Sequence, residues 1–363
     1  MTDFNLTLHT PPSIDSYRPL AERLVDDWLV DSFEREIDSR GGSYYGRFVL
    51  SGLPYIMLRN FFEKSLGYEV RENGGTTWIG LIYEMEITNS DGVVERISLN
   101  NVGNAIQAGY VNNSGERVYS PFQENSESID RYGRKEFSVE TDLDSTAAAE
   151  VARNYLALNA WPRAEVVAMN APTNAPFVVV SVAGYSYTLS WDFPGIGGEI
   201  TAGRNTIAEL IEWIVGESAF LSAGNIQSNA LTCSNELAGQ NGLQMINLFC
   251  DMGDANDTPW TFVVDRNLAV HYGPVDSNYS YTIGLNGISD RSRRPMNLRA
   301  RDLTPGVFRR ANVSSNTRPN MWLTDSRDFF VSRVGVDELG ANKLSVSNID
   351  EWELVQARQR IGE

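Results

Sequence analysis

Residues 76–101 read TTWIGLIYEMEITNSDGVVERISLNN, and this stretch sets the fold class of the chain. Its first half alternates: one side carries Trp78, Gly80, Ile82, Glu84 and Glu86, and the other Ile79, Leu81, Tyr83, Met85 and Ile87. A period of two residues is typical of a β-strand, and Asp91-Gly92 is a hairpin signal. The stretch therefore predicts two antiparallel strands joined by a tight turn.

The flanking segments also predict mainly strands. Gly41-Gly42 lies between two alternating segments and indicates an earlier hairpin, while Asn113-Ser114-Gly115 indicates a later one. Between them, residues 54–66 have the apolar spacing of a short helix, opened by a proline and closed by a glycine. Residues 36–140 are thus predicted to run strand, strand, helix and then at least four strands.

Residues 126–144, SESIDRYGRKEFSVETDLD, place Asp130, Arg131, Arg134, Lys135 and Glu136 around a Tyr132-Gly133 pair. The charges accompany no nucleophile or base, so we interpret the pair as a tight turn that leads into the strand EFSVETD. Asp144 or Ser145 then caps an alanine-rich helix over residues 146–160.

The second half of the chain mixes helices and strands. Residues 177–193 alternate and predict a strand with a bend at Gly184. Thr206 and Glu209 form a capping box in front of a second helix, and a third helix is expected at residues 242–252. A strand hairpin follows that helix.

These elements predict an α+β chain rich in β-structure. We divide it into an N-terminal arm (1–35), a strand-rich domain with its flanking helix 146–160 (36–165), a smaller α/β domain (166–285) and an Arg-rich loop with a C-terminal β region (286–363). A length of 363 residues is sufficient for two or three domains.

Composition restricts the partners of the chain. It has 30 Lys and Arg against 47 Asp and Glu, a net charge of −17, which argues against a protein that grips nucleic acid. The sequence contains no long apolar run and its N-terminus lacks a signal-peptide pattern, so we expect no membrane span and no secretion. Two cysteines are too few for a disulfide framework, and Cys250 is expected to be a small buried hydrophobic residue.

No catalytic group of residues emerges. The two histidines, His9 and His271, belong to different predicted regions, and Ser186 lies in a strand pattern without the nucleophile-elbow glycines. The glycine-rich stretch PGIGGEITAG lacks both phosphate-loop and dinucleotide-binding spacing, and is read as a turn. We therefore expect no enzyme activity and no cofactor.

The only candidate metal ligands are Asp251, Asp254 and Asp257, which recur at every third residue. Calcium loops of the EF-hand type need ligands at alternate residues, a central glycine and a glutamate at position 12. The spacing does not match, so a solvated turn after a helix is the favoured interpretation.

Residues 291–310, RSRRPMNLRARDLTPGVFRR, are the one basic concentration in this acidic chain. Its side chains include Arg291, Arg293, Arg294, Arg309 and Arg310. Nucleic-acid contact is one interpretation, although the segment lacks interleaved aromatic residues. Pairing with acidic groups of a neighbouring copy or partner is the favoured one, because the guanidinium fork binds carboxylates bidentately.

IDRYGRKEFSVETD followed by STAAAEVARNYLALNAWP resembles a pattern of tailed-bacteriophage tail proteins of the baseplate hub and tail-tip (minor tail protein, late-control-like hub) family. WIGLIYEME at 78–86, the spacing NxxNAIQAxY at 101–110, and the segment 253–264 fit the same picture. The resemblance implies a tail-tube-like β-barrel with a flanking helix over residues 36–165.

The resemblance also implies a structural virion protein that is made in the host cytoplasm and forms a ring, a trimer more readily than a hexamer. Its partners would be the tail tube, distal tail, tape-measure and tip or fibre proteins, with DNA only in transit through the channel. Arg131, Tyr132, Arg134 and Lys135 would then contact a neighbouring subunit, as would the arginines of 291–310.

The alternative is a tail-associated protein that binds or hydrolyses glycans. Aromatic side chains could stack on sugars, and Glu84 and Glu86 could serve as acid and base. The two carboxylates are about 7 Å apart along one strand face, estimated from the strand rise, and a solvated face of alternating charge is the simpler interpretation.

Overall fold

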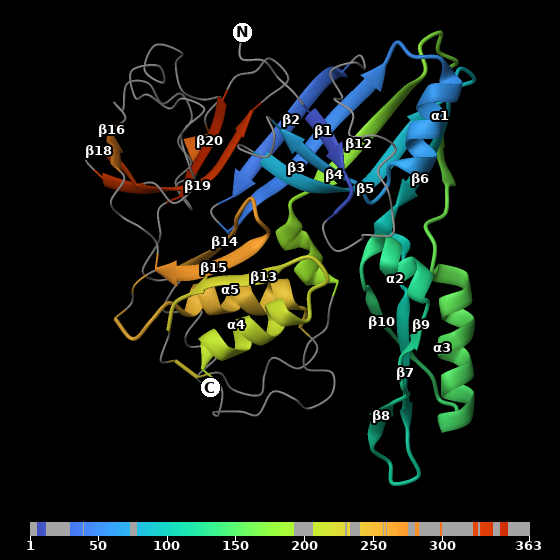
Figure 1. Cartoon of the computed structure of the whole chain (residues 1–363), viewed down its shortest axis with the longest axis vertical. Helices are drawn as coiled ribbons and strands as arrows, with labels where there is room; N and C mark the ends of the chain where they lie inside the picture. Colours follow the sequence, from blue (N-terminus) through green and yellow to red (C-terminus); the bar gives the residue numbers. More distant parts are fainter. Residues whose placement is uncertain are drawn as a thin grey trace. The chain divides into compact units, whose positions relative to one another are not determined.

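The computed structural model describes residues 6–11, 30–38, 40–72, 78–191, 206–228, 231–232, 240–256, 258, 260–274, 280–282, 298–299, 322–325, 327–336 and 342–347. The predicted class, a strand-rich α+β protein, is confirmed (Figure 1). The chain divides into two compact units, each discontinuous in sequence. Unit 1 comprises residues 1–31, 48–182 and 218–220, and unit 2 comprises residues 32–47, 183–217 and 221–363. The four-part division of the sequence stays a prediction.

Strand β5 (Trp78–Thr88) organises the larger sheet of unit 1. It runs antiparallel to β4 (Glu69–Glu72) and to β6 (Val93–Ser98), so the hairpin predicted at Asp91-Gly92 is confirmed. The turn is held by the Asn89 side chain, whose Oδ1 accepts from the backbone N–H of Asp91 at 3.0 Å and of Val93 at 2.9 Å.

The remaining strands of this sheet come from distant parts of the sequence. Strand β1 (Leu6–His9) pairs with β4, β11 (Glu165–Met169) pairs with β6, and β12 (Phe177–Ala183) lies between β5 and β3 (Gly41–Ser51). Helix α1 (Tyr55–Lys64), predicted over 54–66, packs against β5. The core beneath it includes the edge-to-face pair Phe48 and Phe61, with ring centroids 6.4 Å apart.

The barrel implied by the resemblance for residues 36–165 is not closed by the described strands. Their order in unit 1, β1-β4-β5-β12-β3, does not return on itself. One reason is that β12, from outside the expected domain, separates β5 from β3. The other is that residues 105–140 leave this sheet and build a separate one.

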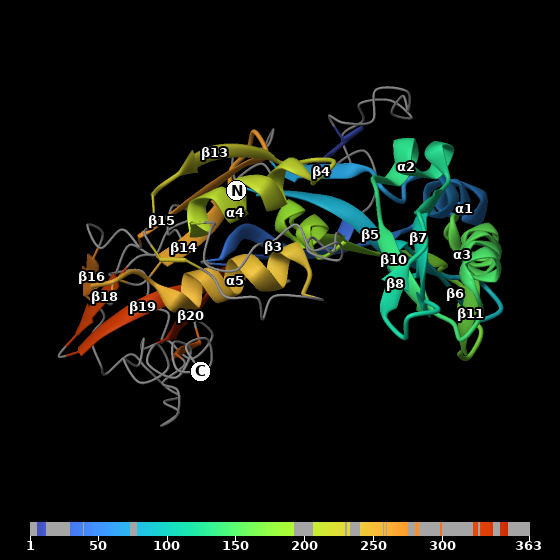
Figure 2. The same cartoon turned by 90° about the horizontal axis from the view of Figure 1, so that it is seen from below.

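The second sheet of unit 1 is centred on β7 (Ala105–Val111). It pairs antiparallel with β8 (Arg117–Tyr119) and β9 (Gln123–Glu124), and parallel with β10 (Glu136–Glu140). Helix α3 (Ser145–Asn159), predicted over 146–160, covers one face of the sheet (Figures 1 and 2). The predicted cap is confirmed: Asp144 Oδ1 accepts from Thr146 N at 3.0 Å and from Ala147 N at 2.9 Å. The core between helix and sheet contains Ile106, Ala108, Ala148, Ala152, Leu156 and Ala160.

Unit 2 contains the predicted capping-box helix α4 (Ile207–Gly216) and the third predicted helix, α5 (Gly242–Met252). Helix α5 packs against β14 (Trp260–Val264), which forms the predicted hairpin with β15 (Ala269–Pro274). Strand β13 (Ser222–Ile226) pairs parallel with β15 and contacts α4. Cys250 is 1% exposed, as predicted, and burial raises the pKa of its thiol to about 12.

The other strands of unit 2 extend from β2 (Val30–Asp38), whose last residues pair antiparallel with β19 (Arg327–Val336). Strand β19 also pairs with β18 (Trp322–Asp325) and β20 (Asn342–Ser347), next to the short strands β16 (Ser280–Thr282) and β17 (Leu298–Arg299). None of the helices in the described segments combines the length and hydropathy needed to cross a bilayer.

The strand predicted over 177–193 is too long. It ends at Ala183, and Tyr185–Ser190 form the 3₁₀ helix η4. The predicted bend at Gly184 is correct: its N–H donates to Tyr44 O at 2.8 Å, and Thr188 Oγ1 then donates to Tyr185 O at 2.7 Å. The alternating pattern predicts that the strand continues after the bend, but residues 185–190 form a helix instead.

The β5–β6 turn gives a direct test of this fold. Gly92 has φ +81°, and a Cβ added there would lie against the backbone carbonyls of Asn170 and Ala171, which follow β11. Gly92→Ala should therefore lower the free energy of unfolding by about 3 kcal/mol, from left-handed backbone strain and steric overlap together. Gly115, with φ +79° and no atom within 4 Å of its added Cβ, is the matched control.

Gly115→Ala should lower the free energy of unfolding by only about 1 kcal/mol, since it incurs the backbone term alone. Urea titrations of both variants measure the difference. Equal losses in the two variants would show that residues 170–171 do not pack on the turn.

Candidate interaction surface

The charged stretch 126–137 begins as a helix rather than as the expected turn. Residues Ser126–Tyr132 form α2, whose N-cap Asn125 accepts from Ser128 N at 3.0 Å. Glu127 lies in its first turn and Arg131 in its last, where each charge complements the helix dipole. The helix ends at Gly133, whose N–H donates to Ile129 O at 2.8 Å.

Asn104, fully buried at the start of β7, holds this stretch in place. Its Nδ2 donates to Gly133 O at 2.8 Å and to Ser128 Oγ at 3.3 Å, and its Oδ1 accepts from Lys135 N at 2.7 Å. Its backbone carbonyl also accepts from Asn125 N at 2.9 Å. Through its side chain and its backbone carbonyl, this one residue therefore fixes both ends of α2 and the entry to β10.

Ser128 extends the same network to helix α3. Its Oγ donates to the carbonyl of Ala160, directly after α3. The Tyr132 ring, 4% exposed, meets the Trp161 ring edge-on at a centroid distance of 6.1 Å. The Tyr-Gly-Arg stretch and the alanine-rich helix are therefore joined by hydrogen bonds and by ring packing.

Lys135 is buried as well, with 6% of its surface exposed. Its Nζ donates to the backbone carbonyl of Leu99, in the short 3₁₀ helix η3 (Leu99–Asn101). Burial lowers the pKa of this ammonium group to about 7, because the charged form has lost most of its hydration. Tyr132 and Lys135, expected at a subunit interface, thus point into their own unit.

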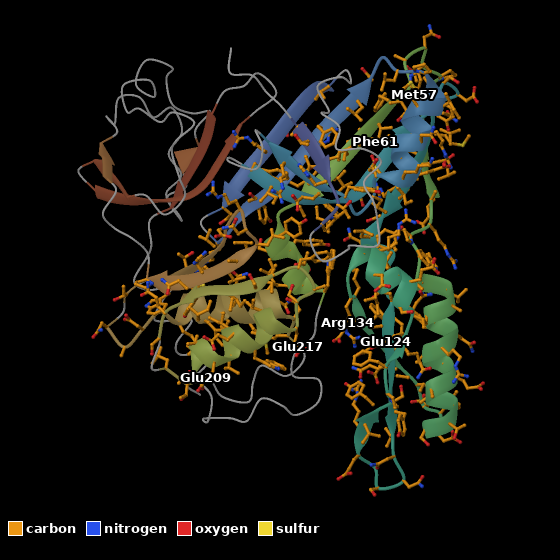
Figure 3. All side chains as sticks on the ribbon, viewed as in Figure 1. Met57, Phe61, Glu124, Arg134, Glu209 and Glu217 are labelled. Atoms are coloured by element: carbon orange, nitrogen blue, oxygen red, sulfur yellow. The ribbon has the colours of Figure 1, made fainter. Side chains whose placement is uncertain are left out.

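The Arg134 guanidinium is held between two carboxylates of the same unit. Its Nε donates to Glu136 Oε1 at 2.8 Å and its Nη1 to Glu124 Oε1. Figure 3 labels Arg134 and Glu124. The group also lies over the Phe122 ring, 4.9 Å from its centroid. Arg131 is half-buried, with its guanidinium 5.1 Å from the centroid of the Tyr132 ring. Of the four expected interface residues, Arg131 and Arg134 reach the surface.

Apolar side chains are exposed close to these charges. On the α3 face of the small sheet, the rings of Phe137 and Tyr155 stack at 5.5 Å with an interplanar angle of 5°. Phe137 is 45% exposed, and Leu158 further along α3 is 57% exposed. Contiguous exposed apolar patches are typical of surfaces that contact another protein.

Two of the three candidate metal ligands, Asp251 and Asp254, are engaged by other groups. Asp251 forms an ion pair with Arg40, and Asp254 Oδ1 accepts from Asn256 N at 2.8 Å and Thr258 N at 3.0 Å. Burial raises the pKa of Asp254, but these backbone hydrogen bonds outweigh it, and the pKa is lowered. Asp257 lies outside the described residues, among which no group of three or more His, Cys, Asp or Glu could hold a metal ion.

The remaining candidate residues are the arginines of 291–310 and the glutamates of β5. Arg291, Arg293, Arg294, Arg309 and Arg310 lie outside the described residues. Glu84 and Glu86 flank Arg96, whose Nε donates to Glu86 Oε1 at 2.7 Å and lies 4.0 Å from Glu84 Oε1. The proposed acid and base thus share an arginine on a strand face, and this pair gives the glycan-hydrolysing alternative no support.

Sequence reasoning missed Asn104 and the burial of Lys135. The only sequence signal for Asn104 was that it directly precedes the strand pattern in NVGNAIQAGY. An asparagine at that position does not identify the groups that its side chain binds. Lys135 follows Arg134 in a charged run, and such runs usually face water.

Comparison with known proteins finds similar solved structures, among them two tail proteins. No protein-family model matches the chain, and no curated protein matches it. A tail protein from Neisseria meningitidis MC58 is similar at 8% identity and a TM-score of 0.40, over 97% of this chain and 98% of that chain. The prophage MuSo2 43 kDa tail protein from Shewanella oneidensis is similar at 8% identity and a TM-score of 0.42, over 95% and 98%. Likeness at these scores does not establish a common fold, and function is argued from the chain's own residues.

The Asn104 network can be tested by truncation. Asn104→Ala should lower the free energy of unfolding by about 3 kcal/mol, because Gly133 O and Lys135 N lose a buried partner. Asn112 is the control: it binds Ser114 N and Glu116 N at 2.9 Å each, but in an exposed turn. Asn112→Ala should lower the free energy of unfolding by about 1 kcal/mol or less. Equal losses of stability in denaturant titrations of the two variants would show that the Asn104 hydrogen bonds do not stabilise the small sheet.

Lys135 makes stability depend on pH. The folded pKa of about 7 lies below the ordinary 10.5, so between these values the unfolded chain binds more protons and stability rises with pH. From pH 7 to 9.5 the wild type should gain about 3 kcal/mol relative to Lys135→Met, which has no titrating group. Lys64→Met, at an exposed lysine of α1, should keep the wild-type pH dependence. Parallel pH profiles for wild type and Lys135→Met would show that Lys135 titrates as an exposed lysine.

Proposed function

We propose that this chain is a structural protein of a phage tail that assembles into a ring at the tail tip or baseplate hub. The ring would join the tail tube and tape-measure protein to the distal tip and fibre proteins, and would enclose the DNA channel. A trimer is the favoured form, with a hexamer as the alternative, and the site of action would be the virion.

One observation carries the proposal. In the stretch that resembles tail proteins, Arg134 and Lys135 are engaged within the chain, while apolar side chains of the adjoining elements are exposed. Arg134 is bridged by Glu124 and Glu136, and Lys135 is buried, whereas Phe137 and Leu158 are exposed. Such an arrangement suits a scaffold that docks onto neighbours through apolar contacts, with charges setting the orientation.

The acidic balance of the chain is compatible with a channel role. A net charge of −17 would repel the phosphates of passing DNA, which favours transit over binding. The arginines of 291–310 would be the counterpart, pairing with acidic groups of a neighbouring subunit.

Charge reversal on the two surface arginines separates docking from folding. Arg131→Glu should leave the monomer folded, because Arg131 is only half-buried and its guanidinium lies over the Tyr132 ring. It should weaken assembly roughly tenfold or more by removing an interface cation. Arg134→Glu should instead destabilise the fold, since it would place a third carboxylate beside Glu124 and Glu136.

Sedimentation velocity over a range of concentrations measures assembly, and thermal unfolding measures the monomer. Arg153→Glu is the matched control, since Arg153 is an exposed arginine on α3 that pairs with Glu150 at 3.8 Å. Normal assembly of Arg131→Glu would refute the docking role of Arg131. A wild-type chain that stays monomeric at every concentration would refute the ring.

A further inference from the structure

The imidazole of His271 makes two contacts in unit 2 that the proposed function does not use. His271 lies on β15, which pairs with β14 on one side and with β13 on the other (Figures 1 and 2). The parallel pairing of β13 with β15 is interrupted, because a register shift separates Ala223 from Ile226. The two residues between them, Gly224 and Asn225, therefore fall outside the regular ladder.

The His271 ring fills this interruption. The N–H of Asn225 donates to His271 Nδ1 at 3.1 Å, whereas in a regular parallel pair it would donate to a strand carbonyl. The ring also lies against Gly224, where an added Cβ would be 2.7 Å from Cε1 and 3.0 Å from Nδ1. A side chain at residue 224 would displace the ring, so the glycine leaves β13 with room to receive it.

The second ring nitrogen is held by Asp265, in the turn between β14 and β15. His271 Nε2 lies 3.2 Å from Asp265 Oδ2. The other carboxylate oxygen, Oδ1, accepts from Asn267 N at 2.8 Å and from Ala269 N at 2.9 Å, which fixes the position of the group. Because the backbone N–H of Asn225 can only donate, Nδ1 carries no proton and accepts. The single proton of the neutral ring is then on Nε2, from which it donates to Asp265.

We propose that His271 is a pH-sensitive switch that holds the middle of β13 on β15 only while its ring is neutral. Protonation converts Nδ1 from an acceptor into a donor that faces the N–H of Asn225, so this hydrogen bond is lost. The contact of Nε2 with Asp265 survives and keeps the charged ring in place. Histidine is the side chain whose charge ordinarily changes between pH 5 and 8.

The opening is confined to the centre of the strand. Four of the five residues of β13 are exposed, so little buried surface opposes a local separation. The two ends have bonds of their own that do not involve the imidazole: Ser222 N donates to Leu268 O at 3.0 Å, and Gln227 N donates to Tyr272 O at 2.9 Å. The result is a strand pair whose central contact depends on pH while its ends stay closed.

The elements around the ring contribute few other ionisable groups. Strands β13 and β14 read SAGNI and WTFVV and contain none. On β15 the other ionisable side chain is Tyr272, whose hydroxyl donates to Phe249 O at 3.2 Å in the core. Arg266, in the same turn as Asp265, is exposed, as are Glu209 and Glu212 of helix α4, which packs on β13.

Asp265 stays a carboxylate while His271 titrates. Burial raises the pKa of Asp265, but hydrogen bonds from Ala269 N, the His271 ring and Asn267 N outweigh burial, and the pKa is lowered. Between pH 5 and 8 the proton that this contact gains is therefore the one on Nδ1.

Nuclear magnetic resonance of the full chain tests the switch. At pH 7.5 the ring nitrogens of His271 should show the tautomer with the proton on Nε2. Between pH 7.5 and pH 5 the hydrogen-exchange protection of the Asn225 N–H, taken relative to its intrinsic rate at each pH, should fall about tenfold, as expected for the loss of one hydrogen bond. The N–H of Ser120, which donates to Ala108 O at 2.8 Å in unit 1, is the internal control and should keep its protection.

Two substitutions separate the acceptor from its titration. His271→Asn places a non-titrating acceptor oxygen near the position of Nδ1, so the Asn225 N–H should stay protected at both pH values. His271→Phe removes the acceptor, so protection should be low at both. Equal protection in the wild type at pH 5 and 7.5, a proton on Nδ1 at pH 7.5, or a pH-dependent loss in His271→Asn would overturn the proposal. The measurement does not depend on assembly, so the switch and the proposed ring can fail separately.

Discussion

The buried side chain of Asn104 is the constraint on which the small sheet of unit 1 depends. A single amide binds the carbonyl that ends α2, a hydroxyl inside α2 and the N–H that leads into β10. Through Ser128 the same network reaches the end of α3. Because an amide has few donors and acceptors and all of these partners are buried, the positions of the two helices and of β10 are coupled. The surface that these elements present can therefore be rigid without a disulfide or a metal.

Because these elements are rigid, the charged side chains of Arg134 and Lys135 are held in fixed positions. Arg134 is fixed by two carboxylates and an aromatic ring, and Lys135 is withdrawn from water, so neither is a freely mobile cation that attracts any anion. What remains for a partner is a surface of defined shape, with stacked rings on α3 and β10 and an apolar edge at β11. Pre-ordered surfaces of this kind lose little conformational entropy on binding, which suits a subunit that occupies one fixed position in an assembly.

The sequence predicted those elements whose signals are local. Helices α3, α4 and α5 were recognisable because Asp144, Thr206 and an amphipathic period mark their starts and faces. Helix α2 was missed because seven residues offer little periodicity, and its cap, Asn125, lay outside the stretch that drew attention. Strand β12 lies between β5 and β3, although it is more than 80 positions away from either strand in the sequence. No local pattern encodes such a pairing.

The candidate surface was likewise predictable only where the sequence signals are local. Residue types predicted Arg131, Arg134 and Lys135 at one subunit surface, but they could not reveal that Lys135 turns inward to the Leu99 carbonyl, since that contact depends on where η3 lies. The exposure of β11 was equally hidden, because Val-Val-Ala-Met reads as a core strand until its neighbours are known. Cryo-electron microscopy of the purified, assembled protein tests most directly whether this chain forms the proposed closed ring. We expect class averages with three-fold symmetry, or six-fold in the alternative, around a central opening. Particles without a central opening, or with only two-fold symmetry, would contradict the proposed ring.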